Sequence, residues 1–229
     1  MLRKTQLVSI ISLLSATSSF AGLYLGASIG PEGASFSQKA HISRPGTFNA
    51  VDKNHFSGLG FFGSIFGGYG WKHDSYYLAG EINLNLSSVE YKLNNDEYLH
   101  LTFSKTFFNV KSSEGISLLP GYFLSDSTLL YGRIGYSNGR VKIVESDPTI
   151  NNASKNRSGI RYGVGIRHSL TPKLDLMMDY SQINYKGIEG RVFEPFGMVT
   201  KVTKISANTA QVGFGLIYNF DQPEPVFVK

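Results

Sequence analysis

The sequence predicts an all-β fold, an eight-stranded antiparallel up-and-down transmembrane β-barrel. Apolar residues alternate with small or polar ones in eight separate segments, and a period of two is the period of a β-strand. Short and long connections join these segments in turn. The chain contains 16 Phe, 13 Tyr and 25 Gly but only 8 Pro, a composition that favours β-structure over helices.

The first 21 residues have the three-part pattern of a secretory signal peptide. Arg3 and Lys4 give a positive start, residues 7–14 form a short apolar run, and residues 19–21 place small side chains at the two positions that a signal peptidase reads. The apolar run is too short for a membrane anchor, because a spanning helix needs roughly 20 apolar residues. We therefore expect cleavage after this site and export from the cytoplasm.

The rest of the chain has a length that suits one domain. We expect the barrel at 22–220 and a short periplasmic tail at 221–229. The formal net charge of +5 falls to +3 when the two basic residues of the signal are removed. An exported protein of such modest charge is not expected to bind nucleic acid.

The alternating segments lie at 23–30, 59–71, 77–84, 116–124, 130–136, 160–167, 174–181 and 211–220. One face of each segment is largely apolar and carries no Lys or Arg, whereas the other carries Gly, Ser, Asn and a few charges. A charge on a lipid-facing surface costs roughly 2–4 kcal/mol at mid-membrane, so the uncharged face suits lipid. A soluble sandwich or lipocalin-like barrel, the alternative, would turn its apolar face inward. Pro120 lacks an N–H for the strand ladder and predicts a β-bulge.

The connections between the segments alternate in length. Tight turns are expected near 72–75, 125–127 and 171–172, and long polar stretches at 39–54, 92–111, 142–157 and 186–204. Short periplasmic turns and long outer loops are typical of bacterial outer-membrane barrels. Aromatic residues gather at the turn ends, as in an interfacial girdle: Tyr69, Trp71, Tyr76, Tyr122, Tyr218 and Phe220. The sequence therefore predicts a location in the bacterial cell outer membrane.

Charged residues also occur on the inward-facing side of the predicted strands, three acids and three bases: Glu81, Arg133, Arg161, Arg167, Asp175 and Asp179. Unpaired charges are costly inside a narrow barrel, whereas paired charges satisfy one another. We therefore expect a lumen charge network of buried pairs, since eight strands leave an interior that side chains can fill. A proton or ion path is the alternative interpretation of the same residues.

Few residues suit catalysis or metal binding. The chain has no Cys, and its histidines show no metal-ligand spacing on one strand face, so no cofactor and no metal are expected. His168 and Ser169 are adjacent in a predicted strand and point to opposite faces. This arrangement does not suit a catalytic pair, and we expect no enzymatic activity.

The four long stretches together carry six more Lys and Arg than Asp and Glu, whereas the rest of the exported chain is net negative. The candidate loop contacts lie in the first and fourth stretches: Lys39, Arg44, Lys53, Arg191, Lys201 and Lys204. A basic outer surface attracts polyanions, which predicts contact with lipopolysaccharide phosphates or with acidic glycans of a host surface. A solvated surface without a dedicated partner is the alternative.

Four stretches resemble the opacity-protein and OmpA/OmpX-like group of outer-membrane barrels: GLYLGASIG at 22–30, LLYGRIGYS at 129–137, SGIRYGVGIRHSLTPKLDLMMDYS at 158–181 and TAQVGFGLIYNF at 209–220. The resemblance implies an eight-stranded barrel whose closing strand, ending at Phe220, is recognised by the barrel-assembly machinery. The chain departs from the group by continuing as DQPEPVFVK where many such barrels end. It also departs from the similar lipid A deacylase barrels, in which one residue separates the His from the Ser.

The group includes adhesins, serum-resistance proteins, narrow porins and structural proteins, so the resemblance does not fix one activity. The leading expectation is a non-enzymatic surface protein that stabilises the outer membrane. Its loops would interact with a host surface or with lipopolysaccharide. The first alternative is a narrow porin-like channel for ions or small solutes, and the second is a lipid-modifying enzyme.

Overall fold

The computed structural model describes residues 21–95, 104–145, 153–194 and 198–220. These residues form ten strands: β1 (Ala21–Arg44), β2 (Phe48–His73), β3 (Tyr76–Ser87), β4 (Glu90–Asn95), β5 (Ser104–Ser125), β6 (Thr128–Glu145), β7 (Ala153–Thr171), β8 (Leu174–Tyr185), β9 (Ile188–Glu194) and β10 (Val199–Asn219). In the described part of the chain, no helix is long and apolar enough to cross a membrane. The predicted signal peptide, except for its last residue Ala21, and the predicted tail lie outside the described residues.

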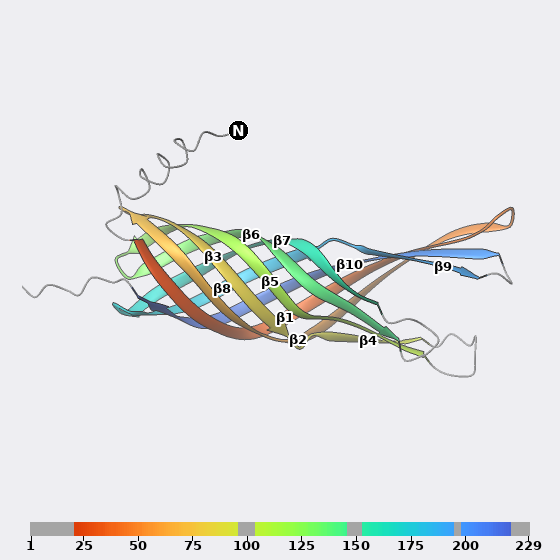
Figure 1. Ribbon diagram of the computed structural model, residues 1–229, viewed down its shortest axis with the longest axis horizontal. Coiled ribbons are helices and arrows are strands. Elements are labelled where there is room, and N and C mark those ends of the chain that lie inside the picture. Colours follow the sequence, from red (N-terminus) through yellow and green to blue (C-terminus); the bar gives the residue numbers. More distant parts are fainter. Residues whose placement is uncertain (1–20, 96–103, 146–152, 195–197, 221–229) are drawn as a thin grey trace, which may run out of the picture.

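Eight of these strands form a closed antiparallel ring (Figure 1). The order around the ring is β1, β2, β3, β5, β6, β7, β8 and β10. Pairing of β1 with β10 closes it, over a ladder that runs from Tyr24 opposite Asn219 to Ser43 opposite Thr200. The predicted eight-stranded up-and-down barrel is therefore confirmed, and each ring strand is a neighbour of the ring strand that precedes it in the chain.

The three short turns lie at one end of the barrel, where the described chain also begins and ends (Figure 1). They are two-residue connections, of which the first contains Asp74 with a φ of 53°. Aspartate tolerates this left-handed conformation better than most residues. The predicted aromatic residues gather at this end as edge-to-face pairs, with centroids 4.9 Å apart for Tyr69 and Trp71 and 5.1 Å apart for Tyr218 and Phe220.

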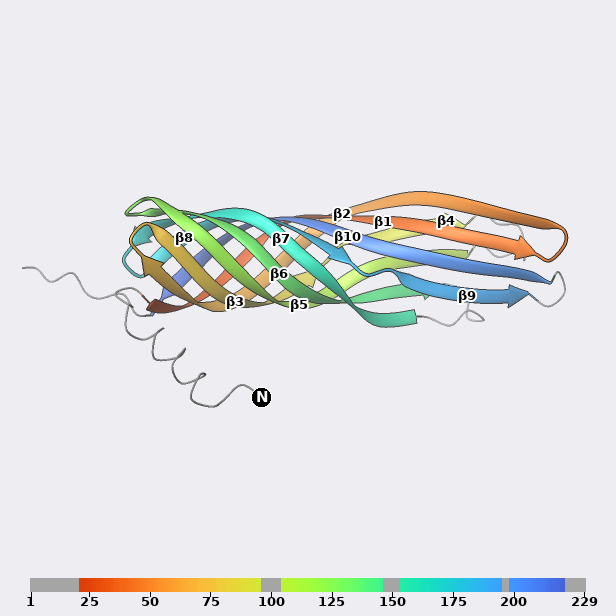
Figure 2. The same ribbon diagram turned by 90° about the horizontal axis from the view of Figure 1, so that it is seen from above.

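At the opposite end, β1, β2, β9 and β10 continue beyond the ring as a four-stranded extension (Figures 1 and 2). The stretch 39–54 is therefore not the irregular loop that we expect from its polarity. It is a hairpin whose strands stay paired up to Arg44 opposite Phe48, with Gly46 in the turn at a φ of 72°. The alternation signal fails here because both faces of the extension meet water, so neither needs an apolar side chain.

Two strands, β4 and β9, are additions to the eight expected. β9 lies within the predicted loop stretch 186–204, and β4 overlaps the start of the predicted stretch 92–111. In the described part of the chain, β4 pairs with β5 and β9 pairs with β10. The stretch 142–157 likewise continues the ladder between β6 and β7 where it is described. The outer connections are thus largely continued strands.

The strands turn their apolar face outward, as predicted. Leu25 is 56% exposed, whereas its neighbour Tyr24 is 3% exposed, and the same alternation recurs in the part of each ring strand that lies within the barrel. So wide a belt of exposed Leu, Ile, Val, Phe and Tyr side chains is unsuited to water and suits a bilayer. The inward positions hold the small, polar and charged residues together with the apolar side chains that fill the interior.

The bulge predicted at Pro120 is absent. β5 pairs with β6 in one register on both sides of Pro120, from Leu118 opposite Ile134 to Gly121 opposite Tyr131. The missing N–H therefore removes a rung of the ladder without adding a residue to the strand. The register shifts lie between Val110 and Ser113 and between Phe123 and Ser125.

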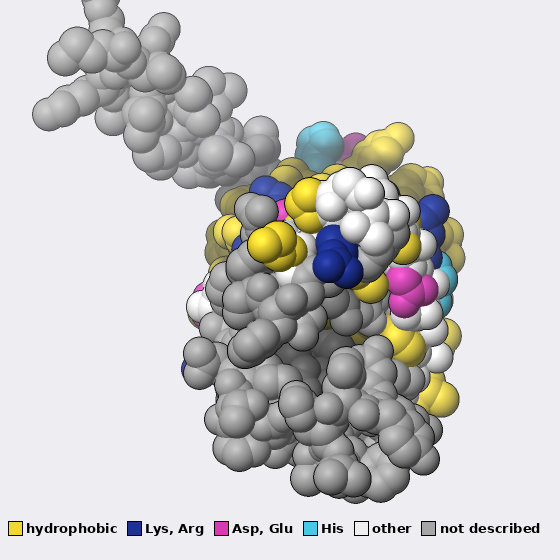
Figure 3. Space-filling model, turned by 90° about the vertical axis from the view of Figure 1, so that its right-hand side faces the viewer, with side chains coloured by type: hydrophobic (Ala, Val, Ile, Leu, Met, Phe, Trp, Pro, Cys, Tyr) yellow, Lys and Arg dark blue, Asp and Glu magenta, His cyan; other side chains and the backbone are white. Residues whose placement is uncertain are grey.

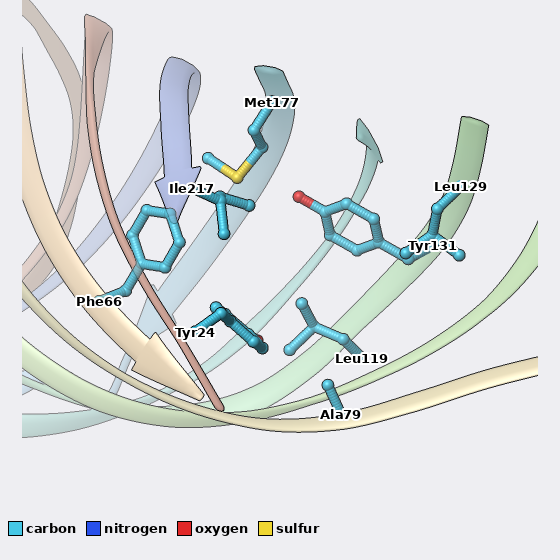
Figure 4. Close-up of a cluster of buried hydrophobic side chains, with 8 residues drawn as sticks. All are labelled: Tyr24, Phe66, Ala79, Leu119, Leu129, Tyr131, Met177 and Ile217. Atoms are coloured by element: carbon cyan, nitrogen blue, oxygen red, sulfur yellow. The ribbon is translucent and has the colours of Figure 1, made fainter. Parts of the chain in front are cut away.

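The interior is filled by two apolar clusters. One lies toward the short-turn end and is drawn in Figure 4, where side chains from different strands point toward one another: Tyr24, Phe66, Ala79, Leu119, Leu129, Tyr131, Met177 and Ile217. The other lies toward the extension: Ala34, Phe36, Val89, Val110, Ile183, Tyr185 and Ala207. Most of the buried polar and charged residues lie between the two clusters or beside the first.

Candidate functional site

Inside the barrel, Arg133 on β6 joins two carboxylates from other strands. Its Nη1 lies 2.5 Å from Oε1 of Glu81 on β3, and its Nε lies 3.2 Å from Oδ2 of Asp179 on β8. All three side chains are almost completely buried. Gly163, which pairs with Arg133, leaves no room for a side chain, because an added Cβ would collide with the backbone of Tyr180. The three residues thus form a chain of buried ion pairs across the lumen.

Arg167 on β7 extends this network toward the short-turn end. Its Nη2 lies 3.0 Å from Oε2 of Glu81, and the hydroxyl of Tyr24 donates a 3.0 Å hydrogen bond to the same oxygen. The guanidinium of Arg167 also lies over the rings of Tyr24 and Tyr131, 4.6 Å and 4.9 Å from their centroids. Arg167 is therefore held by charge, hydrogen bonds and ring faces together.

Tyrosines complete the network. Tyr131 donates a 2.9 Å hydrogen bond to Oδ2 of Asp179, and Arg167 donates to the hydroxyl of Tyr77 at 3.3 Å. The sequence places Tyr24 and Tyr131 on the inward face but does not identify them as partners of the charges. A tyrosine that occupies an inward-facing position close to an inward-facing charge is the sequence signal that could have identified these two partners.

Two of the six predicted lumen residues lie outside this network. Arg161 is buried, but none of the ion pairs among the described residues includes it; its Nε and Nη2 donate to the hydroxyl of Ser181 at 3.2 Å and 2.9 Å. Asp175 is half-buried near the short turns, where it accepts a 2.9 Å hydrogen bond from Asn219. The predicted network of six residues is therefore corrected to four, because the ion pairs among the described residues join only Glu81, Arg133, Arg167 and Asp179.

A buried acid outside the predicted set, Glu32 on β1, lies in the polar layer between the two apolar clusters. Its Oε1 accepts a 2.9 Å hydrogen bond from Gln211 on β10, across the seam where the ring closes. The alternation in β1 continues inward past Pro31 to Glu32, which is the signal that sequence reasoning missed. Several atoms in this layer lack a protein partner, including Nη1 of Arg161 and both amide atoms of Asn83. Such buried groups are usually satisfied by internal water.

On the outside, the extension brings three of the predicted loop contacts together. Lys39 on β1 pairs directly with Lys53 on β2 on one side and with Lys204 on β10 on the other. Residues directly opposite each other in neighbouring strands point to the same face. All three lysines are exposed, and we call them the lysine row. Figure 3 views the molecule from this end and shows Lys and Arg side chains in dark blue.

The other three predicted contacts do not join the row. Arg44 is exposed at the tip of the hairpin, five residues beyond Lys39. Arg191 lies in β9 opposite Val202, and Lys201 lies in β10 opposite Ile42, while their side chains lie outside the described part of the structure. On the fourth strand, Glu189 pairs with Lys204 and is exposed. The row therefore ends in one acid and keeps an excess of positive charge.

The remaining candidates for catalysis or metal binding stay apart. Among the described residues, no group of three or more His, Asp or Glu side chains could hold a metal ion. His168 is exposed, and its Nδ1 lies 3.0 Å from the hydroxyl oxygen of Thr128. His41 contacts Asn49 on the extension.

Solved structures of bacterial surface proteins are similar to this chain. Ail of Yersinia pestis, solved with the heparin analogue sucrose octasulfate, is 14% identical over 83% of this chain and 99% of Ail, with a TM-score of 0.39. Neisserial surface protein A is 16% identical over 88% of this chain and all of that protein, with a TM-score of 0.46. OprG of Pseudomonas aeruginosa is 14% identical over 89% of this chain and 98% of OprG, with a TM-score of 0.46.

No curated protein matches the sequence. The family model for the outer membrane protein beta-barrel domain, in contrast, matches residues 6–220, nearly the whole chain. Together with the closed ring of eight antiparallel strands and the apolar outer belt, this match leads to one conclusion: the chain belongs to the outer membrane β-barrel protein family and is a protein of the bacterial outer membrane.

Proposed function

We propose that this protein is a non-enzymatic surface barrel that stabilises the outer membrane and binds polyanions through its extension. The lysine row carries the proposal. Like charges directly opposite each other destabilise a sheet, so three adjacent lysines are a cost that a bound anion would offset. Lys53 lies six residues beyond Leu59, where the unbroken apolar run of the β2 outer face ends, and six residues span roughly 20 Å along an extended strand; Val51, still farther out, is a single apolar side chain. The row therefore stands clear of the hydrocarbon.

The chemistry of the row favours a polymer with repeated sulfate or phosphate groups. Neighbouring strands lie about 4.8 Å apart, so the three ammonium groups form a line of closely spaced positive charges. An acidic glycan of a host surface and the phosphates of lipopolysaccharide both present such groups. Salt weakens either contact, because the Debye length is about 8 Å at physiological ionic strength and shortens as salt increases.

The test compares two triple variants with the same loss of charge. In the first, Lys39, Lys53 and Lys204 are each changed to Gln. In the control, Lys111, Lys173 and Lys186, which are exposed elsewhere, are each changed to Gln. Binding of the folded protein to immobilised heparin and to lipopolysaccharide is measured over a range of salt concentrations. We expect the first variant to lose about tenfold or more in affinity, equivalent to about 1.4 kcal/mol, and the control to lose much less.

The two ligands distinguish the source of the anion. Loss of heparin binding alone would identify a glycan outside the cell, and loss of lipopolysaccharide binding alone would identify the lipid. Equal losses of affinity in both triple variants would show that binding depends on the net charge of the protein and not on the lysine row. Unchanged binding by the lysine-row variant would remove the polyanion part of the proposal and leave the membrane-stabilising role.

The absence of catalysis is also part of the proposal. His168 points outward at the short-turn end, where it contacts Thr128 rather than an acid. We expect lipid A from cells with and without the protein to give the same mass spectrum, and a consistent loss of one acyl chain would refute this part.

A further inference from the structure

A groove crosses the outward face of the barrel wall between β1 and β7. It consists of two adjoining hollows, of about 700 and 660 Å³, that share Ile65, Leu84, Glu114 and Asn138. These four side chains point outward, so the groove belongs to the outer wall and not to the lumen. Small-molecule sites occupy roughly 300–1,000 Å³, and each hollow is within that range.

The β1–β3 part of the groove is apolar, and small residues form its floor. Ala27 and Gly63 lie between the larger side chains of Ile29, Ile65 and Leu84. A Cβ atom added to Gly63 would have Cγ2 of Ile29, at 4.0 Å, as its nearest neighbour. The space above Gly63 is therefore open on a wall that faces hydrocarbon.

The β5–β7 part of the groove is polar. Asn138 donates a 3.1 Å hydrogen bond to Glu114, which occupies one oxygen of that carboxylate. Arg140, one outward position further along β6, is exposed and pairs with Asn156 on β7. Because barrel strands are tilted, a row that crosses them also climbs through the membrane. The groove therefore runs from the hydrocarbon up to the polar interface on the extension side.

We propose that this groove is a binding site for a phosphorylated outer-leaflet lipid, the lipid A part of lipopolysaccharide. An acyl chain lies over Ala27, Gly63 and Leu84, and a phosphate lies beside Arg140. The wall faces hydrocarbon, so an acyl chain is the occupant that the apolar part meets. At the polar end, the guanidinium of Arg140 supplies the positive charge and the amide of Asn156 supplies a further hydrogen-bond donor, while the amide of Asn138 is hydrogen-bonded to the carboxylate of Glu114.

The first experiment fills the groove. Gly63→Leu puts a side chain into the open space, and Gly132→Leu is the matched control: Gly132 also faces outward, lies outside the groove and has its nearest neighbour at 3.8 Å. Mature protein folded in detergent is titrated with purified lipid A, and retained lipid is counted by native mass spectrometry. We expect Gly63→Leu to reduce retention about tenfold and Gly132→Leu to leave it unchanged. A heat-dependent gel shift, which is typical of a folded barrel, verifies that both variants are folded.

The second experiment tests the headgroup contact with dephosphorylated lipid A as the probe. The wild type is expected to retain lipid A in preference to the dephosphorylated form. Arg140→Gln is expected to abolish this preference, and Arg140→Lys to keep it. The lysine row lies outside the groove and clear of the hydrocarbon, so its variant is expected to retain isolated lipid A normally while it loses affinity for heparin, and failure of this proposal is therefore distinguishable from failure of the polyanion proposal.

Three results would overturn the lipid site. One is equal retention by Gly63→Leu and the wild type. Another is equal loss in both leucine variants, which would indicate a general lipid shell. The third is a protein dimer that Gly63→Leu abolishes, which would make a second copy of the chain the occupant.

Discussion

Arg133 is the residue on which the buried network depends most. It is the one cation among the described residues that contacts both Glu81 and Asp179, and all three groups are removed from water. A buried pair is not strongly stabilising in itself, but the loss of one partner leaves a charge that nothing neutralises. Glu81 keeps Arg167 and Tyr24 as partners, whereas Asp179 keeps only the hydroxyl of Tyr131 among the contacts described.

We therefore expect Arg133→Ala to lower the free energy of unfolding by about 3 kcal/mol. Arg161→Ala is the comparison: it loses hydrogen bonds to Ser181 and orphans no acid, so we expect about 1 kcal/mol. Guanidinium unfolding of both variants in lipid vesicles gives the two values. A larger loss for Arg161→Ala than for Arg133→Ala would contradict the assignment of partners.

The alternation of each strand predicts which of these residues point inward, because parity is a property of one strand. The alternation does not predict which of the inward-facing side chains contact one another. The contact of Arg133 with Glu81 and Asp179 depends on lateral spacing across several strands and on the reach of long side chains, which no single segment contains. For this reason the sequence could not show that Arg161, which faces inward like Arg133, lies outside the network of ion pairs.

The seam between β1 and β10 is the element that turns a sheet into a closed ring. Its backbones come very close at Gly30, where an added Cβ would collide with the carbonyl oxygen of Val212. Pro31 follows and has no N–H, so the ladder lacks rungs at this point and resumes at Glu32 opposite Gln211. The glycine makes the close approach possible.

We expect Gly30→Ala to destabilise the barrel by about 1–3 kcal/mol, as overpacking does elsewhere. Gly80→Ala is the matched control, because a Cβ at Gly80 meets nothing within 4 Å. The fraction of protein that shows a heat-dependent gel shift after refolding, together with the guanidinium midpoint, measures the effect. Equal midpoints for the two variants would show that the seam has room to adjust.

The ring strands could be predicted in advance, whereas the extension could not. In the ring, lipid on one side and a filled lumen on the other impose a period of two on the side chains. In the outer parts of β1 and β2, water reaches both faces, as the exposed Val51, Asp52 and Lys53 show. Backbone pairing continues there, but the sequence has no hydrophobic alternation from which these strands could be predicted.

Side chains fill the lumen of the described barrel at two levels. Phe36, Ile183 and Tyr185 belong to the apolar cluster near the extension, and the buried ion pairs and aromatic rings fill the part near the short turns. The polar layer between them holds unpartnered atoms and a cavity of about 10 Å³ beside Glu81, Arg133 and Arg161, which is space for about one water molecule. This arrangement supports a scaffold rather than the narrow channel.

In planar bilayers we therefore expect the protein to produce no stepwise current above that of the bare membrane. Phe36→Ala combined with Tyr185→Ala empties only the outer cluster and is also expected to stay silent. Addition of Arg133→Ala to that pair disturbs both levels and is the variant in which leakage is expected. Regular conductance steps from the wild type would favour the porin-like alternative.

The paired strands of the extension also determine what kind of epitope this surface would present to antibodies. Lys53, Lys39 and Lys204 are neighbours only while β2, β1 and β10 stay in register. An antibody that recognises this patch reads a discontinuous epitope, which boiling destroys and which no linear peptide spanning 39–54 reproduces. Side chains on the outer face can also be exchanged without touching the backbone ladder, so antigenic variation at alternate positions is compatible with an unchanged scaffold.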